Sequence, residues 1–352
     1  MFYPLKFKPL YKDYIWGGRN LEQLGKELPE GNVAESWELS CHPDGQSIIL
    51  NGGLKDMYLD ELIKKYRADV IGTSLPSSAI DKFPLLIKFI DANDRLSVQV
   101  HPKDEYARIN ENGELGKNEM WYIISAKDGA KLVYDVAPGT TRETFRKAID
   151  EGKINECLNY VPVKAGDMLN IPAGLVHAIG KGIVLAEVQQ NSNTTYRVYD
   201  YDRVDKNGNK RPLHVEKALD VINFEGAGTG EKAVGLGYSE SDYHMNIKIA
   251  NSYFAIEEID LHGKMSEKAD GSKFFINIFT EGSGRMIYSD GSIDVKFGET
   301  VLIPASMGDY TLEGNLKVIK TYVPDIEKDI IEKLISKGFS RDEILNKVAG
   351  LK

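Results

Sequence analysis

One nine-residue pattern occurs twice in this chain and restricts its possible folds more than any other feature. Residues 166–174 read GDMLNIPAG, and residues 298–306 read GETVLIPAS. In both segments a Gly lies at the same distance before a Pro-Ala pair, and apolar residues precede the Pro. Repeated segments of this kind indicate one supersecondary unit used more than once. Chance similarity between two hairpin ends is the alternative, but the pattern favours two similar β units.

Strand-like runs occupy most of the chain and form two series. Each run is short, rich in β-branched and aromatic residues, and bounded by Gly, Pro or Asp, which is typical of a sandwich or barrel. The first series covers residues 37–42, 84–92, 96–101, 120–125, 131–136, 167–173 and 182–190; the second covers 253–261, 274–281, 284–289, 299–305 and 316–324. Long helices do not alternate with these runs, which argues against a Rossmann sheet. We expect a mainly β fold.

Helical patterns are few. Apolar residues recur at helical spacing in residues 54–67, 141–158 and 325–348. These segments predict a small helical insertion near residues 54–82, one further helix, and a helical tail at residues 325–352.

Charge and composition exclude several classes of protein. The 44 Lys and Arg against 53 Asp and Glu give a formal net charge of −9, which disfavours general binding to nucleic acid. Two Cys residues cannot form a disulfide framework in a chain of 352 residues. The sequence shows no secretory signal and no apolar stretch long enough to cross a bilayer. We therefore predict a cytoplasmic protein with neither a nucleic acid nor a membrane as partner.

Two segments carry residues that could bind a metal. The first copy of the repeat continues to His177, as Gly166-x5-Pro172-x-Gly174-x2-His177. This resembles the second signature of the cupin barrel, whose His points into the barrel. The second copy has Asp309 at the corresponding position, so we expect one metal-binding barrel and one degenerate barrel.

The segment Ser97-Val-Gln99-Val-His101 supplies a second group of candidate ligands. Alternate residues of a strand point to the same face, so Ser97, Gln99 and His101 should project together. Glu119 begins another strand-like run. Two imidazoles, a carboxylate and an amide oxygen suit Zn²⁺, and Fe, Mn or Co could also occupy such a site.

Longer matches identify a family. The run FPLLIKFIDANDRLSVQVHPKDEYA (residues 83–107) resembles the signature of type I phosphomannose isomerases. Residues 34–40 (AESWELS) and 116–122 (GKNEMWY) resemble further segments of the family, and residues 187–203 (EVQQNSNTTYRVYDYDR) resemble its short bacterial form. The resemblance implies two cupin barrels, one zinc ion, and interconversion of mannose 6-phosphate and fructose 6-phosphate through an enediol or enediolate.

Carried over by position, the resemblance assigns the residues of the site. It implies zinc on Gln99, His101, Glu119 and His177. It places Arg197 beside the reacting carbons, Lys117 near the substrate and its phosphate, Ser97 against the phosphate, and Glu187 in the same cavity. Lys117 and Arg197 together are expected to supply the positive charge that holds the phosphate. The base is left open among Glu187, Lys117 and a metal-bound water. Larger members have Asp at the position of Asn193 and His at that of Gly116, so a mechanism that needs that Asp is not available here.

These inferences predict an architecture and leave alternatives. The N-terminal barrel with the metal should span residues 1–230, the degenerate barrel 231–324 and the tail 325–352, in a monomer or weak homodimer. A sugar-phosphate-binding protein without activity, a cupin oxygenase, and an isomerase of another sugar phosphate are the competing functions, and fold alone cannot decide among them.

Overall fold

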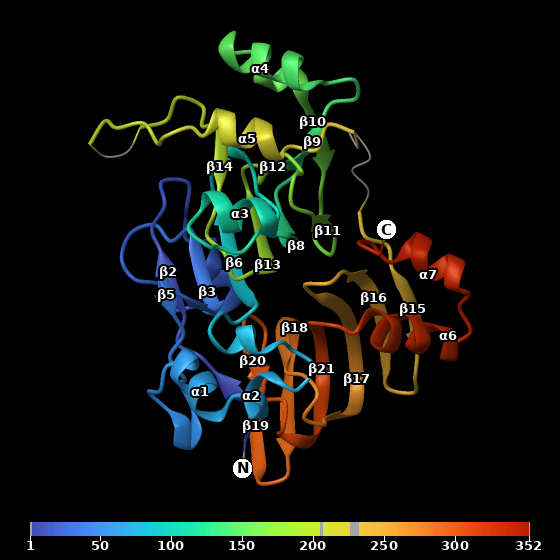
Figure 1. Cartoon of the computed structure of the whole chain (residues 1–352). Helices are drawn as coiled ribbons and strands as arrows, with labels where there is room; N and C mark the ends of the chain where they lie inside the picture. The colour runs from blue at the N-terminus through green and yellow to red at the C-terminus, as the bar shows by residue number, and fades with distance from the viewer. Residues whose placement is uncertain (1, 205–206, 226–231, 352) are drawn as a thin grey trace.

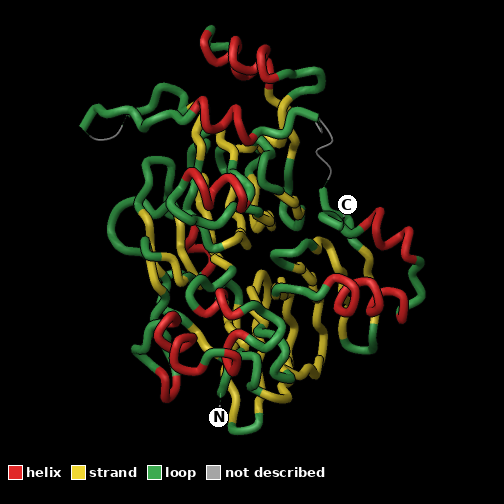
Figure 2. The backbone as a smooth tube through the Cα atoms, viewed as in Figure 1, coloured by secondary structure: helices red, strands yellow, loops and turns green. Residues whose placement is uncertain are grey.

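The chain folds mainly into β-strands, as the strand-like runs predict (Figures 1 and 2). The computed structural model describes residues 2–204, 207–225 and 232–351. The predicted domain boundary between residues 230 and 231 lies outside the described residues. Sheets of eight, six, five and two strands hold the strands of the described ranges. No helix among the described residues is both long and apolar enough to span a membrane.

Two of these sheets build the first half of the molecule. In spatial order, the six-stranded sheet contains β11 (Met168–Ile171), β8 (Glu119–Ala126), β13 (Ile183–Gln190), β6 (Leu85–Ala92), β3 (Glu35–Leu39) and β2 (Leu10–Lys12). The five-stranded sheet contains β10 (Leu158–Pro162), β9 (Lys131–Val136), β12 (His177–Ala178), β7 (Val98–Val100) and β14 (Tyr196–Tyr199). The small sheet pairs β4 (Cys41–His42) with β5 (Gly45–Gln46).

The central strands of the six-stranded sheet are covered on both faces. All eight residues of β6 and all eight of β13 are buried. Leu85, Ile87 and Phe89 belong to one hydrophobic cluster, whereas Ile90 and Ala92 belong to another. Burial on both faces explains why the sequence of β6 shows a nearly continuous apolar run without clear alternation.

The second half is one antiparallel sheet. Its spatial order is β1 (Leu5–Lys6), β20 (Thr300–Ile303), β18 (Phe275–Tyr288), β21 (Gly308–Tyr322), β17 (Ala255–Ala269), β16 (Tyr243–Ala250) and β15 (Leu236–Ser239), and β19 (Gly291–Lys296) pairs with β18. The runs predicted at 274–281 and 284–289 are one strand, β18, with a register shift between Phe279 and Glu281. A bulge lets one strand bend without ending. The two separate runs in the sequence therefore do not reveal that the strand is continuous.

Strand β1 comes from the start of the chain but pairs with the sheet of the second half. Leu5 lies opposite Leu302, and Lys6 lies opposite Val301. The Lys6 Nζ also contacts Glu299 Oε2 at 2.8 Å. The two halves are therefore joined by strand pairing as well as by the chain.

Each sheet of the described residues has end strands, and the eight-stranded sheet has three of them, β1, β15 and β19. The mainly β class predicted from the sequence is thus confirmed, while a closed ring of hydrogen-bonded strands is not present in these ranges. A jelly roll needs no such ring, because it consists of two packed sheets.

Helices lie at the periphery of the sheets (Figure 2). The predicted insertion contains α1 (Leu59–Tyr66), α2 (Ala68–Ile71) and the short 3₁₀ helices η2 (Gly52–Leu54) and η3 (Ser77–Ile80). The others before the tail are η1 (Asn20–Leu24), α3 (Asp104–Asn110), α4 (Arg142–Asp150), η4 (Ile154–Cys157) and α5 (Val215–Val221). The helix expected over 141–158 ends at Asp150, and Gly152 at φ 70° turns the chain there.

The predicted tail is helical and packs against the sheet of the second half (Figure 1). It consists of the π-helix η5 (Ile326–Glu332), α6 (Lys333–Ser336) and α7 (Arg341–Lys347). Its buried apolar residues are Ile330, Ile331, Leu334, Ile344 and Val348. Lys333 Nζ lies 2.6 Å from Oε1 of Glu257, a fully buried carboxylate on β17. Apolar packing and a buried ion pair together hold the tail in place.

Candidate functional site

A cavity of about 270 Å³ lies in the first half of the molecule. Both sheets of that half line it, because its wall includes residues of β7 and β14 from one sheet and of β6, β8 and β13 from the other. Six of the residues predicted for the site line this cavity: Ser97, Gln99, Lys117, Glu119, Glu187 and Arg197. The remaining two, His101 and His177, are buried beside it and contact its wall.

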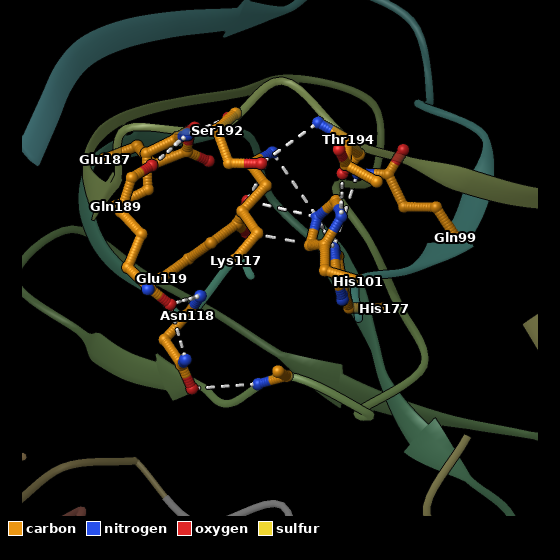
Figure 3. A network of polar contacts seen from close by, with 12 residues as sticks. Gln99, His101, Lys117, Asn118, Glu119, His177, Glu187, Gln189, Ser192 and Thr194 are labelled. Carbon is orange, nitrogen blue, oxygen red and sulfur yellow. Dashed lines mark hydrogen bonds and ion pairs between the residues drawn. The ribbon is translucent and has the colours of Figure 1, made fainter. Parts of the chain in front are cut away.

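The two histidines face each other through the same ring atom (Figure 3). His177 on β12 pairs with Gln99 of β7, and His101 directly follows that strand. Their Nε2 atoms are 3.1 Å apart. Nδ1 of His101 lies 2.8 Å from the carbonyl oxygen of Thr194, and Nδ1 of His177 lies 2.9 Å from that of Leu175. Each Nδ1 must therefore donate its hydrogen, which leaves both Nε2 atoms as acceptors.

Glu119 completes this group from the opposite sheet. Its Oε1 lies 3.1 Å from Nε2 of His101, and its Oε2 lies 3.8 Å from Nε2 of His177. Both carboxylate oxygens are buried and neither accepts a hydrogen bond of good geometry. Burial alone would raise the pKa of Glu119, but Lys117 and His101 lower it well below the ordinary value. The carboxylate is therefore ionised.

The only cation that touches this group within the described ranges is Lys117. Its Nζ lies 2.8 Å from Oε1 of Glu119 and 3.4 Å from Nε2 of His101. Burial and Lys117 lower the pKa of His101 to about 3, and burial lowers the pKa of His177. Both imidazoles are thus neutral and able to act as ligands.

This arrangement fits a divalent metal ion. The ligand atoms of His101, Glu119 and His177 all lie within 4.8 Å of one another, and no other such cluster occurs in the described part of the chain. Two ligand nitrogens of a tetrahedral zinc ion lie about 3.3 Å apart, close to the 3.1 Å seen between the Nε2 atoms. The two Nε2 atoms and the Glu119 carboxylate are all acceptors, and neither carboxylate oxygen accepts a hydrogen bond of good geometry. A cation bound among them would supply the missing positive partner.

Gln99 extends the cluster toward Arg197. Its Nε2 lies 3.4 Å from Nε2 of His177, and its Oε1 lies 3.4 Å from the hydroxyl of Ser97. The Ser97 hydroxyl in turn accepts a hydrogen bond from Nε of Arg197 at 3.2 Å. The predicted alternation along residues 97–101 is confirmed by these contacts. A half-turn of the Gln99 amide about its terminal bond would point its oxygen at the histidines.

A second group of charges lies on the wall formed by the six-stranded sheet. Glu187 Oε2 accepts a hydrogen bond from Trp121 Nε1 at 2.9 Å, and its Oε1 lies 3.4 Å from Lys88 Nζ. Lys88 also lies 3.6 Å from Oε2 of Glu35, which accepts a hydrogen bond from Trp37. Burial and the nearby Glu119 raise the pKa of Glu187 to about 7.

Sequence reasoning missed Lys88 and Glu35 as members of the site. Both are buried, and both line the cavity. The available signal is that Lys88 interrupts an apolar strand, since a lysine is almost never fully buried without a partner. Burial alone would lower the pKa of Lys88, but Glu35 and Glu187 raise it.

The cavity wall near Arg197 is basic. Arg211 and His214 lie in it, and neither was among the residues predicted for the site. Arg211 contacts Asp200 through two nitrogens, at 2.8 and 2.6 Å. Burial and Arg211 lower the pKa of Arg197. Asn193 also lines the cavity, and its amide nitrogen donates to Asp44 Oδ2 at 2.7 Å.

The second copy of the repeat is different, as expected. Asp309, which takes the place of His177, is exposed and pairs with Lys268 across β17 and β21. It does not belong to the metal-ligating cluster.

Comparisons with known proteins agree with these features. Residues 5–129 match the family model described as phosphomannose isomerase type I, catalytic domain. Residues 245–323 match that described as mannose-6-phosphate isomerase, cupin domain.

Full-length relatives are also similar to this chain. Mannose-6-phosphate isomerase ManA of Bacillus subtilis is 41% identical over 91% of this chain and 99% of its own length. A mannose-6-phosphate isomerase of Streptococcus mutans is 36% identical over 91% and 98%. The crystal structure of a mannose 6-phosphate isomerase from Bacillus subtilis superposes with a TM-score of 0.84 and 34% identity, covering 90% of this chain and 99% of that one.

Proposed function

Since this chain belongs to the type I phosphomannose isomerase family, we propose that it interconverts mannose 6-phosphate and fructose 6-phosphate with one zinc ion. One observation carries the proposal. A buried set of facing acceptors, with Nε2 atoms 3.1 Å apart and the Glu119 carboxylate beside them, opens into a cavity that also holds Arg197, Arg211 and Lys117. The fold supports it as well, and we infer that the two sheets of the first half are the two layers of a cupin jelly roll.

We assign the zinc ion to His101, His177, Glu119 and Gln99. Backbone carbonyls orient the two imidazoles, which is the outer-shell support that metal-bound histidines need. When bound, a divalent ion supplies positive charge that polarises a carbonyl and stabilises an enediolate. The single protein carboxylate leaves that charge only partly neutralised.

We assign the phosphate of the substrate to the basic end of the cavity. Ser97 and Arg197 contact each other there, and Arg211 and His214 lie in the same wall. Guanidinium groups suit phosphate because several N–H donors match its oxygens. Local positive charge of this kind is what an acidic protein needs in order to hold an anionic substrate.

We assign proton transfer to Glu187 and Lys117. Moving a carbonyl from C1 to C2 requires a base that removes a proton from one carbon and returns it to the next. Oε1 of Glu187 is buried without a hydrogen-bond donor, and a carboxyl pKa near 7 suits a group that takes and gives a proton at neutral pH. Lys117 contacts the ligands His101 and Glu119, so it can orient them and the hydroxyl of a nearby sugar carbon.

A coupled assay tests the proposed function. Mannose 6-phosphate is supplied, and fructose 6-phosphate is measured before chelation, after chelation and after zinc is restored. Activity that disappears with the chelator and returns with zinc is expected. Zinc-loaded protein without turnover would refute the isomerase assignment and favour a binding function. The cytoplasmic location and the monomeric or weakly dimeric state remain predictions.

A further inference from the structure

Three buried charged residues of the cavity wall, Glu35, Lys88 and Glu187, lie on the three adjacent strands β3, β6 and β13. Lys88 on β6 lies directly opposite Glu187 on β13 and opposite Trp37 on β3. Glu187 lies opposite Trp121 on β8. The exposed fractions of Lys88, Glu187 and Glu35 are 3%, 3% and 8%, so solvent screens their interaction little.

The two carboxylates are held in the same way from opposite sides of Lys88. Trp37 donates to Glu35 at 2.6 Å, and Trp121 donates to Glu187 at 2.9 Å. The Lys88 Nζ lies 3.6 Å from the first carboxylate and 3.4 Å from the second. One cation is therefore shared between two carboxylates.

We propose that Lys88, shared between Glu35 and Glu187, is a positioning residue that sets how readily the Glu187 carboxylate takes up and releases a proton. The inference rests on the proposed function only in giving Glu187 its role in proton transfer. Lys88 favours the ionised form of Glu187, whereas Glu35 draws part of that positive charge away. The other charged groups that face Glu187 are Glu119 and Lys117, from β8 and the segment before it.

Two substitutions are expected to act in opposite directions. Lys88→Met removes the cation, so the apparent pKa of Glu187 should rise by one unit or more. Glu35→Gln removes the competing carboxylate while keeping an oxygen for Trp37, so the same pKa should fall. Lys88→Arg keeps the charge and should restore behaviour close to that of the original protein. General loosening of the fold cannot produce opposite shifts.

The experiment measures kcat against pH for the zinc-loaded enzyme, with KM determined at each pH. The acid limb of the profile should move to higher pH in Lys88→Met and to lower pH in Glu35→Gln. KM should change less than kcat in both variants. Lys320→Met is the matched control, because Lys320 is likewise buried and contacts two carboxylates, Glu257 and Glu267, but lies in the second half. It should leave the profile unchanged.

A second readout does not depend on turnover. Carbon-13 NMR of protein labelled at the Glu carboxyl carbons follows the titration of Glu187, which is assigned by its loss in Glu187→Gln. Absence of isomerase activity with the expected NMR shifts would refute the proposed function and leave the role of Lys88 intact. Equal shifts in both variants, or no shift in either, would overturn the role of Lys88. If Lys88→Met does not fold, the pKa of Glu187 is compared between Glu35→Gln and Lys88→Arg. It should fall in Glu35→Gln and stay close to the original value in Lys88→Arg, and equal shifts or no shift would overturn the role of Lys88.

Discussion

His101 and His177 direct the same ring nitrogen at each other across 3.1 Å, while their other nitrogens are bound to backbone carbonyls. Two acceptors at this distance repel each other unless a cation lies between them. The backbone therefore fixes the tautomers that a metal ion requires.

The first prediction concerns metal content. His177→Ala removes one imidazole ligand, and we expect zinc affinity to fall by more than about 100-fold, since even outer-shell changes cost 10–100-fold. Metal per chain is measured by mass spectrometry after dialysis against limiting zinc. His262→Ala, which changes an exposed histidine of the second half, should keep one ion. Full zinc occupancy in His177→Ala would contradict the assigned ligands.

The second prediction concerns Arg197. Arg197→Ala removes the guanidinium that contacts Ser97, and kcat/KM for the sugar phosphate should fall by about 100- to 1,000-fold, as for other lost charge-stabilising donors. Inhibition by inorganic phosphate should weaken in parallel, which ties the loss to the phosphate. Arg285→Ala provides the control, because Arg285 is exposed on β18. Unchanged phosphate inhibition would place the phosphate elsewhere.

The third prediction concerns the stability of the second half at acid pH. Lys333 and Lys320 outweigh burial and lower the pKa of Glu257 to about 2. Because this pKa is lower in the folded than in the unfolded protein, the stabilisation is complete above the unfolded value near 4.3 and is lost as the pH falls toward 2. Its size is on the order of 3 kcal/mol.

Urea unfolding at pH 7 and pH 3 tests this in the original protein and in Glu257→Gln. The variant should be less stable at pH 7, and the difference should shrink at pH 3. A difference that stays constant with pH would show that the ionised carboxylate is not its source.

The fourth prediction concerns the tail. Leu334 is fully buried against the sheet, whereas its neighbour Ile335 is 47% exposed. Leu334→Ala should lower the free energy of unfolding by about 2–5 kcal/mol, and Ile335→Ala by about 0.5 kcal/mol or less. Both should retain kcat, because the tail packs on the second half and the cavity lies in the first. Equal destabilisation by the two changes would mean that the tail does not dock as described.

Much of the site follows from local sequence patterns. Alternation along a strand placed Ser97, Gln99 and His101 on one face, and this face persists although β7 itself spans only Val98–Val100. The repeat likewise separated His177 from Asp309. Such patterns work where a ligand and its neighbours lie within a few residues of one another.

The remainder depends on contacts that no local pattern contains. Lys88 meets Glu35 and Glu187 only because β6 lies between β3 and β13 in the sheet. Burial on both faces also removes the alternation that would have marked Lys88 as facing the cavity. The pairing of β1 with β20 joins residues almost 300 positions apart, so neither end of that pair predicts the other.

That pairing has a consequence for how the protein is made. Leu5 and Lys6 leave the ribosome long before their partners Leu302 and Val301 are synthesised. At 5–20 residues per second, the first strand waits roughly 15–60 s for its place in the sheet. Through that interval Lys6 can bond to Leu50 and Asn51, but the strand lacks its partner β20. The sheet of the second half can gain this end strand only after β20 has been synthesised.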